Sequence, residues 1–183
     1  VGLSLHGRLN PEGRNRAISA IARFKQLAKS MGINELTAVA TAAVRTASDG
    51  QDFCQEVREK TGQFIAVISG EEEARLAAQG VLTGWPGAYG LVCDLGGTSL
   101  ELAEISKGKV GTCASAELGP LKLMEIDKKK ERLEYISSQL FHLAKSFVLQ
   151  NNRLFLVGGS WRALARIDME TVSYTHLTLP TIR

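Results

Sequence analysis

The sequence Asp94-Leu95-Gly96-Gly97-Thr98-Ser99-Leu100-Glu101 joins two predicted strands, residues 89–94 and 99–105. Its two glycines form a turn whose backbone N–H groups can approach a phosphate closely, because no Cβ stands in the way. Ser99 adds a hydroxyl donor, and the turn brings Glu101 back toward Asp94. Two carboxylates beside a phosphate-binding turn suit Mg²⁺, which prefers hard oxygen ligands. The alternative is a simple hairpin whose acidic side chains are solvated.

The flanking segments alternate between predicted strands and helices. Upstream, Asn10-Pro11 opens a helix that ends at Gly32, and further elements follow at residues 36–41 (strand), 52–59 (helix), 64–68 (strand) and 69–79 (helix). Downstream we expect a strand at 110–116, a helix at 127–149, a strand at 153–157 and a short helix. This order predicts an α/β fold. The turn-rich sequence at 84–87 suggests a boundary between domains at 1–86 and 87–172.

The composition is that of a soluble globular protein: 183 residues, 44% hydrophobic, with a net charge of +3. The small charge surplus does not indicate a nucleic-acid-binding protein, and the apolar runs are too short to predict a membrane span. Three separated cysteines without a C-x-x-C motif favour a reducing, cytoplasmic setting. The first residues of the chain do not fit the pattern of a signal peptide, and they resemble the middle of a longer protein. Residues 173–183 are expected to be a non-native tail, or alternatively an ordinary strand and terminus.

A second candidate site residue is Glu73, in the acidic start of the helix predicted from Ser69. Glu71, Glu72 and Glu73 all gain from the positive end of the helix dipole, which is the structural explanation for them. Glu73 also lies one turn before Ala77, at the edge of the apolar stripe. A carboxylate at such an edge can have its pKa raised by desolvation, which suits a general base.

Two further positions are candidates for phosphate binding. Gly158-Gly159 follows a predicted buried strand, where it is either a tight turn or a place where a phosphate approaches the backbone. Arg45 follows the strand at 36–41, and its guanidinium can pair with a phosphate through two hydrogen bonds. A surface role is the alternative for Arg45.

Taken in order, these segments resemble the exopolyphosphatase and guanosine pentaphosphate phosphohydrolase (Ppx/GppA) family over residues 1–172. The resemblance rests on VATAAVRTA (39–47), VISGEEEARL (67–76), DLGGTSLEL (94–102), Leu118-Gly119 and Val157-Gly158-Gly159. It implies the actin-like ATPase fold, in which two RNase H-like α/β domains close over a phosphate-binding cleft. It also implies that the first phosphate-loop hairpin of that fold, an Asp-x-Gly-Ser-Asn-Ser segment, precedes Val1.

The resemblance implies a role for each candidate residue. Glu73 aligns with the carboxylate that activates water, and Asp94 and Glu101 align with residues that hold the metal, expected to be Mg²⁺. The second phosphate loop corresponds to Gly96, Gly97, Thr98 and Ser99, with Gly158, Gly159 and Arg45 as further phosphate-binding positions. The family loop usually has a third glycine and a threonine, where this chain has Thr98 and Leu100.

The implied activity is hydrolysis of the terminal phosphate of inorganic polyphosphate or guanosine pentaphosphate (pppGpp). The motifs do not discriminate between these two substrates. A non-catalytic nucleotide- or phosphate-binding module of the same fold is the alternative, because fold alone does not determine function. A kinase of this fold is disfavoured by the position of Glu73. The resemblance is also compatible with a homodimer of the full-length protein.

Overall fold

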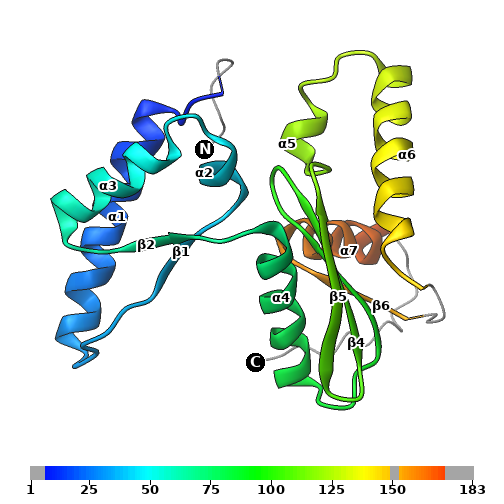
Figure 1. The fold of residues 1–183 in the computed structure, drawn as a ribbon, viewed down its shortest axis with the longest axis horizontal. Coiled ribbons are helices and arrows are strands. Elements are labelled where there is room, and N and C mark those ends of the chain that lie inside the picture. Colours follow the sequence, from blue (N-terminus) through cyan, green and yellow to red (C-terminus); the bar gives the residue numbers. More distant parts are fainter. Residues whose placement is uncertain (1–6, 149–152, 172–183) are drawn as a thin grey trace. The chain divides into compact units, whose positions relative to one another are not determined.

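A computed structural model describes residues 7–148 and 153–171 and shows a mixed α/β chain (Figure 1). The chain forms two compact units, Val1–Ser69 and Gly70–Arg183. The units divide before the helix that follows Ser69, whereas the sequence suggests a domain boundary after residue 86. The difference arises because this helix packs against the sheet of the second unit.

The first unit consists of two long helices, one short helix and two short strands. In chain order these are α1 (Pro11–Ser30), β1 (Ala38–Ala40), α2 (Ala42–Thr46), α3 (Gly50–Thr61) and β2 (Ile65–Val67). The predicted start of α1 is confirmed, because the Asn10 side chain accepts a hydrogen bond of 3.0 Å from the N–H of Gly13. Strands β1 and β2 are parallel, with Ala38 opposite Ile65. Their core is built from Leu9, Ile18, Phe53, Val57 and Ile65.

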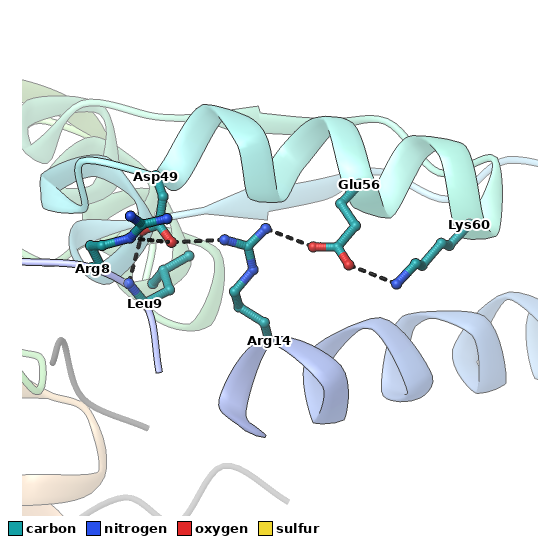
Figure 2. Close-up of polar contacts among 6 residues, drawn as sticks. All are labelled: Arg8, Leu9, Arg14, Asp49, Glu56 and Lys60. Carbon is teal, nitrogen blue, oxygen red and sulfur yellow. Dashed lines mark hydrogen bonds and ion pairs between the residues drawn. The ribbon is translucent and has the colours of Figure 1, made fainter. Parts of the chain in front are cut away.

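A buried carboxylate ties the start of this unit to the beginning of α3 (Figure 2). Asp49 accepts hydrogen bonds from the N–H of Leu9 at 2.9 Å and from Nη1 of Arg14 at 2.7 Å. The other guanidinium nitrogen of Arg14 reaches Glu56 on α3 at 2.6 Å. These bonds lower the pKa of Asp49, and the Leu9 N–H has the largest effect. The network therefore fixes residues before α1 against α3.

The second unit is a four-stranded sheet covered by helices. Its elements are α4 (Gly70–Gly84), β3 (Gly90–Leu95), β4 (Leu100–Ser106), β5 (Lys109–Ala116), α5 (Pro120–Leu123), α6 (Lys129–Lys145), β6 (Leu154–Val157) and α7 (Gly159–Thr171). The strand order is β5-β4-β3-β6; β3 pairs with β4 in antiparallel fashion and with β6 in parallel. The predicted three-stranded meander is thus confirmed, and β6 joins it.

Opposite faces of this sheet pack against different helices, as Figure 1 shows for α4 and α6. Val92 and Ala103 pack with Ala74 and Ala78 of α4. Their sequence neighbours, such as Cys93, point the other way and pack with Leu143 of α6 and Trp161 of α7. Asp94 is two residues from Val92, and Glu101 is two residues from Ala103, so both side chains lie on the face of the sheet that packs against α4. Ser115 is directly opposite Glu101 and lies on the same face.

Several predicted boundaries differ from the observed ones. Helix α4 continues to Gly84 rather than ending near residue 79, because its later turns also pack on the sheet. Helix α6 begins at Lys129 and ends at Lys145, inside the predicted range of 127–149. The short helices α2 and α5 were not predicted, since four or five residues show no periodicity. The predicted tail at 173–183 lies outside the described residues, and no described helix is both long and apolar enough to cross a membrane.

Candidate functional site

A row of polar side chains crosses three strands of the second unit. Asp94 on β3 lies directly opposite Glu101 on β4, and Glu101 lies directly opposite Ser115 on β5. Directly opposed residues in an antiparallel pair have Cβ atoms about 4.5–5.5 Å apart on one face of the sheet. The register thus confirms the expectation that the turn returns Glu101 to Asp94, and it adds Ser115, which sequence analysis missed.

Glu101 is almost completely buried, with a side chain at the α4 face and 1% of the residue exposed. Burial raises its pKa to about 7, and the charges of Glu73 and Asp94 add to this effect. The hydroxyls of Ser99 and Ser115 oppose the shift. Ser115 donates a hydrogen bond of 3.0 Å to Oε1 of Glu101, whereas Oε2 has no hydrogen-bond partner of good geometry among the described residues. One carboxylate oxygen is thus held and the other is left for a ligand.

Glu73 belongs to the same acidic group, through the first turn of α4. Its charge contributes to the raised pKa of Asp94, although desolvation is the larger cause there. The preceding residue, Glu72, behaves differently: Nε of Arg75 donates to it at 2.7 Å on the same helix, and this lowers the pKa of Glu72. Of the two adjacent glutamates, Glu73 is therefore the one whose charge acts on the Asp94–Glu101 pair.

The predicted phosphate-binding turn, residues 96–99, is a tight hairpin that joins β3 to β4. The N–H of Gly96 donates to the carbonyl of Ser99 at 3.0 Å. Gly97 is exposed, whereas Ser99 is buried. Thr98 completes the turn. The structure therefore places residues 96–99 beside the carboxylates, as the sequence predicts.

The segment around α5 supports this turn from the side. The N–H of Leu121 donates to the carbonyl of Gly97 at 2.8 Å. A Cβ on Gly119 would lie 2.3 Å from the nitrogen of Thr98 and 2.4 Å from the carbonyl carbon of Gly97, which no real structure tolerates. Gly119 is thus required by a close approach of two backbone segments. The sequence shows Gly119 only as part of the Leu118-Gly119 motif, with no sign of this contact.

Gly158 approaches the same group from β6. It has φ of +107°, and a Cβ there would lie 2.8 Å from Oδ1 of Asp94. A side chain at position 158 would therefore meet the carboxylate, which explains a glycine at this junction. Gly159 begins α7 and has open space around the position of a Cβ. The structure brings Gly158 close to Asp94, and a role of this junction in phosphate binding stays a prediction.

Arg45 lies in the first unit, at the end of the short helix α2. Its Nη1 donates to the carbonyl of Ile68 at 2.8 Å, and the side chain is half-buried. The guanidinium is thus held near the end of the first unit rather than free at its surface. The group formed by residues 73, 94, 101 and 158 belongs to the second unit alone.

The donor set fits a hard divalent cation that is shared with a substrate. Glu101 offers a buried oxygen that has no hydrogen-bond partner among the described residues, and Asp94 lies directly opposite it on the neighbouring strand. Among residues 7–148 and 153–171, no group of three or more histidine, cysteine or acidic side chains is placed to hold a metal by itself. Mg²⁺ is commonly bound by one or two carboxylates, with water and phosphate oxygens as its other ligands. The residues present therefore fit such an ion.

A hollow in the first unit lies apart from the predicted site residues. It is an open groove of about 890 Å³ between α3 and β2, with Cys54, Arg58 and Phe64 among its lining residues. None of the predicted site residues lines it.

The chain is similar to known exopolyphosphatases. Exopolyphosphatase 1 from Mycobacterium tuberculosis is 38% identical over 99 residues, which are 53% of this chain and 29% of that protein. The Mycobacterium leprae protein of the same name is 36% identical over the same share. The chain thus spans well under two thirds of the curated relatives it matches.

Solved structures show the same fold. The exopolyphosphatase from Cytophaga hutchinsonii superposes with a TM-score of 0.79 at 23% identity, over 90% of this chain and 56% of that one. A Ppx/GppA family member from Aquifex aeolicus gives 0.71 at 26% identity, over 92% and 57%. The predicted fold class, an α/β fold of the actin-like ATPase group, is confirmed. The family model of the Ppx/GppA phosphatases matches residues 1–181, so the chain belongs to the Ppx/GppA phosphatase family.

Proposed function

We propose that the protein containing this chain hydrolyses the terminal phosphate of inorganic polyphosphate or of pppGpp, by attack of water. The observation that carries the proposal is the pair of opposed carboxylates of half-buried Asp94 and buried Glu101. The pair lies beside a glycine turn, and the charge of Glu73 raises the pKa of both carboxyl groups. Buried carboxylates next to exposed backbone donors are typical of sites that transfer phosphoryl groups with a metal ion.

In this proposal Glu73 is the general base. It accepts a proton from water as the water oxygen bonds to the terminal phosphorus, and the bridging P–O bond breaks with its electron pair on the leaving phosphate. No nucleophile from the protein is needed, because positioning and charge neutralisation dominate phosphoryl transfer. Glu73 is preferred to the adjacent Glu72 because it is the charge of Glu73 that acts on Asp94 and Glu101.

Asp94 and Glu101 hold the divalent cation in this proposal, and we propose Mg²⁺. When bound, the cation neutralises charge that develops on the phosphate oxygens. The loop of Gly96, Gly97, Thr98 and Ser99 is the proposed phosphate-binding segment. Because the N–H of Gly96 donates to the carbonyl of Ser99, the N–H groups of Gly97 and Thr98 are the ones proposed to contact the phosphate. Gly158, Gly159 and Arg45 are proposed as further phosphate-binding positions.

The decisive experiment measures phosphate release from polyphosphate and from pppGpp by the complete protein. Glu73→Gln should lower kcat by about 100-fold or more, the usual contribution of a general base. Glu71→Gln is the matched control, since Glu71 is exposed on the same first turn. It should leave kcat within about twofold of the wild type. Equal activity of Glu73→Gln and wild type would show that Glu73 is not the base.

A second candidate function is binding of a nucleotide or phosphate without turnover. It is favoured by Thr98 and Leu100, which replace a glycine and a threonine usual in the family loop. The loss of a glycine restricts the backbone, and the loss of a hydroxyl removes one donor. Tight binding of polyphosphate with no Mg²⁺-dependent phosphate release would support this second function over hydrolysis.

A further inference from the structure

Ser115 is a polar residue of the site that belongs to none of the sequence motifs. It lies on β5, two strands away from Asp94 and directly opposite Glu101. Its hydroxyl donates a hydrogen bond of 3.0 Å to Oε1 of Glu101. Ser115 is half-buried, and β5 is an edge strand of the sheet. The hydrogen bond therefore joins the buried carboxylate of Glu101 to the edge strand.

A glutamate at position 101 needs such a restraint. Its side chain has three rotatable bonds, and fixing a long side chain of this kind costs conformational entropy. A hydrogen bond to a charged acceptor is strong enough to offset most of that cost. Ser115 binds Oε1, and Oε2 has no hydrogen-bond partner of good geometry in the part of the chain that the structure describes. The hydroxyl of Ser99 also acts on the Glu101 carboxyl group.

We propose that Ser115 is a positioning residue: its hydroxyl fixes the rotamer of Glu101 so that Oε2 faces the ligand beside Asp94. This proposal rests on the proposed function, in which Asp94 and Glu101 hold a divalent cation. Ser115 touches neither the cation nor the phosphate and acts through Glu101 alone.

Thr112, on the same strand as Ser115, provides a control for the loss of the Ser115 hydroxyl. Thr112 is exposed and carries a hydroxyl on the same strand, but it lies on the opposite face. Removing its hydroxyl tests whether any change on β5 affects the site. Thr112→Val keeps the shape of the side chain and is the matched control.

The test compares Ser115→Ala, Ser115→Thr and Thr112→Val in the complete protein. With polyphosphate as substrate and Mg²⁺ at a concentration that saturates both proteins, Ser115→Ala should lower kcat about tenfold and leave KM within about twofold, because substrate binding does not require the fixed rotamer. Ser115→Thr retains the hydroxyl and should recover kcat to within about threefold of the wild type. Thr112→Val should not differ from the wild type.

A second readout does not depend on activity. Mg²⁺ alone should raise the Tm of the wild-type protein, since it binds the folded state only. The Mg²⁺ concentration that gives half of this rise should be about fivefold higher for Ser115→Ala than for the wild type. Circular dichroism without Mg²⁺ should show that all three variants are folded.

The proposal is overturned if Ser115→Ala matches the wild type in kcat and in Mg²⁺ midpoint, or if Ser115→Thr loses as much activity as Ser115→Ala. A wild-type protein that releases no phosphate would instead refute the proposed function. In that case the Mg²⁺ midpoints alone decide the role of Ser115, and an Mg²⁺ response that is absent or unchanged by Ser115→Ala refutes it.

Discussion

At the scale of single residues, Glu101 shows how burial changes the chemistry of an ordinary carboxyl group. Its pKa of about 7 lies above 4.5, the ordinary value of a glutamate side chain, with desolvation as the main cause. The folded protein therefore binds the proton more tightly than the unfolded chain does. Stability that comes from the neutral carboxyl is fully present below about pH 4.5 and is lost as the pH rises to about 7.

We predict that Glu101→Gln changes stability in a pH-dependent way. Glutamine stays neutral at every pH, whereas Glu101 must ionise as the pH rises. The free energy of unfolding of the variant minus that of the wild type should therefore be about 3 kcal/mol larger at about pH 8 than at about pH 4. Urea unfolding at both pH values, with a chelator present, measures this difference. A stability difference that is the same at both pH values would contradict the raised pKa.

At the scale of elements, the turn at 96–99 is stabilised by a segment that follows β5. Gly119 allows the backbone of this segment to approach the peptide between Gly97 and Thr98, and α5 then supplies the N–H of Leu121. The turn is therefore positioned by contacts from about twenty residues later in the chain as well as by its own glycines.

We predict that Gly119→Ala forces the turn to move. The added Cβ would overlap with backbone atoms, which cannot rotate away as a side chain can, so stability should fall by about 2 kcal/mol. Phosphate release should fall with it. Urea unfolding and the phosphate assay measure the two effects.

Gly80→Ala is the matched control for this substitution. Gly80 lies inside α4, and a Cβ there meets nothing within 4 Å. Alanine should therefore raise stability by about 0.5–1 kcal/mol, because it restricts the unfolded chain and favours the helix. Two variants of equal stability would show that the approach at Gly119 is not tight.

At the scale of the whole molecule, each compact unit has apolar clusters of its own. The cluster of the first unit includes Phe53 and Val57, and those of the second include Val92 and Leu143. Asp49 stabilises only the first unit, through Leu9 and Arg14 (Figure 2). Because these bonds lower the pKa of Asp49, the stability they provide is present above about pH 3.8 and is lost as the pH falls further.

We predict that Asp49→Asn loosens the first unit and leaves the second unchanged. The amide keeps an acceptor for Leu9 but loses the charge that Arg14 and Arg8 contact. Hydrogen exchange followed by mass spectrometry should show faster exchange at β1 and β2 and unaltered exchange at β3 and β4. Equal acceleration in both units would contradict the assignment of Asp49 to one of them.

Local patterns were sufficient to predict much of the fold. Asn10-Pro11 predicts the start of α1, because capping depends on residues within one turn. The sequence at 94–101 predicts both the hairpin and the meeting of its two carboxylates, because a short turn sets the register of the strands that it joins. The helices α2 and α5 could not be predicted, since their residues are helical only in their tertiary setting.

The amino-acid sequence by itself determined the α/β order, the family and the identities of Glu73, Asp94 and Glu101 as candidates. Only the tertiary structure decided that Glu101 is buried, that Ser115 holds it, and that Gly119 contacts the turn. The physical reason is distance along the chain. A turn or a cap is made by neighbouring residues, whereas burial and strand pairing depend on segments that meet only after the sheet has formed.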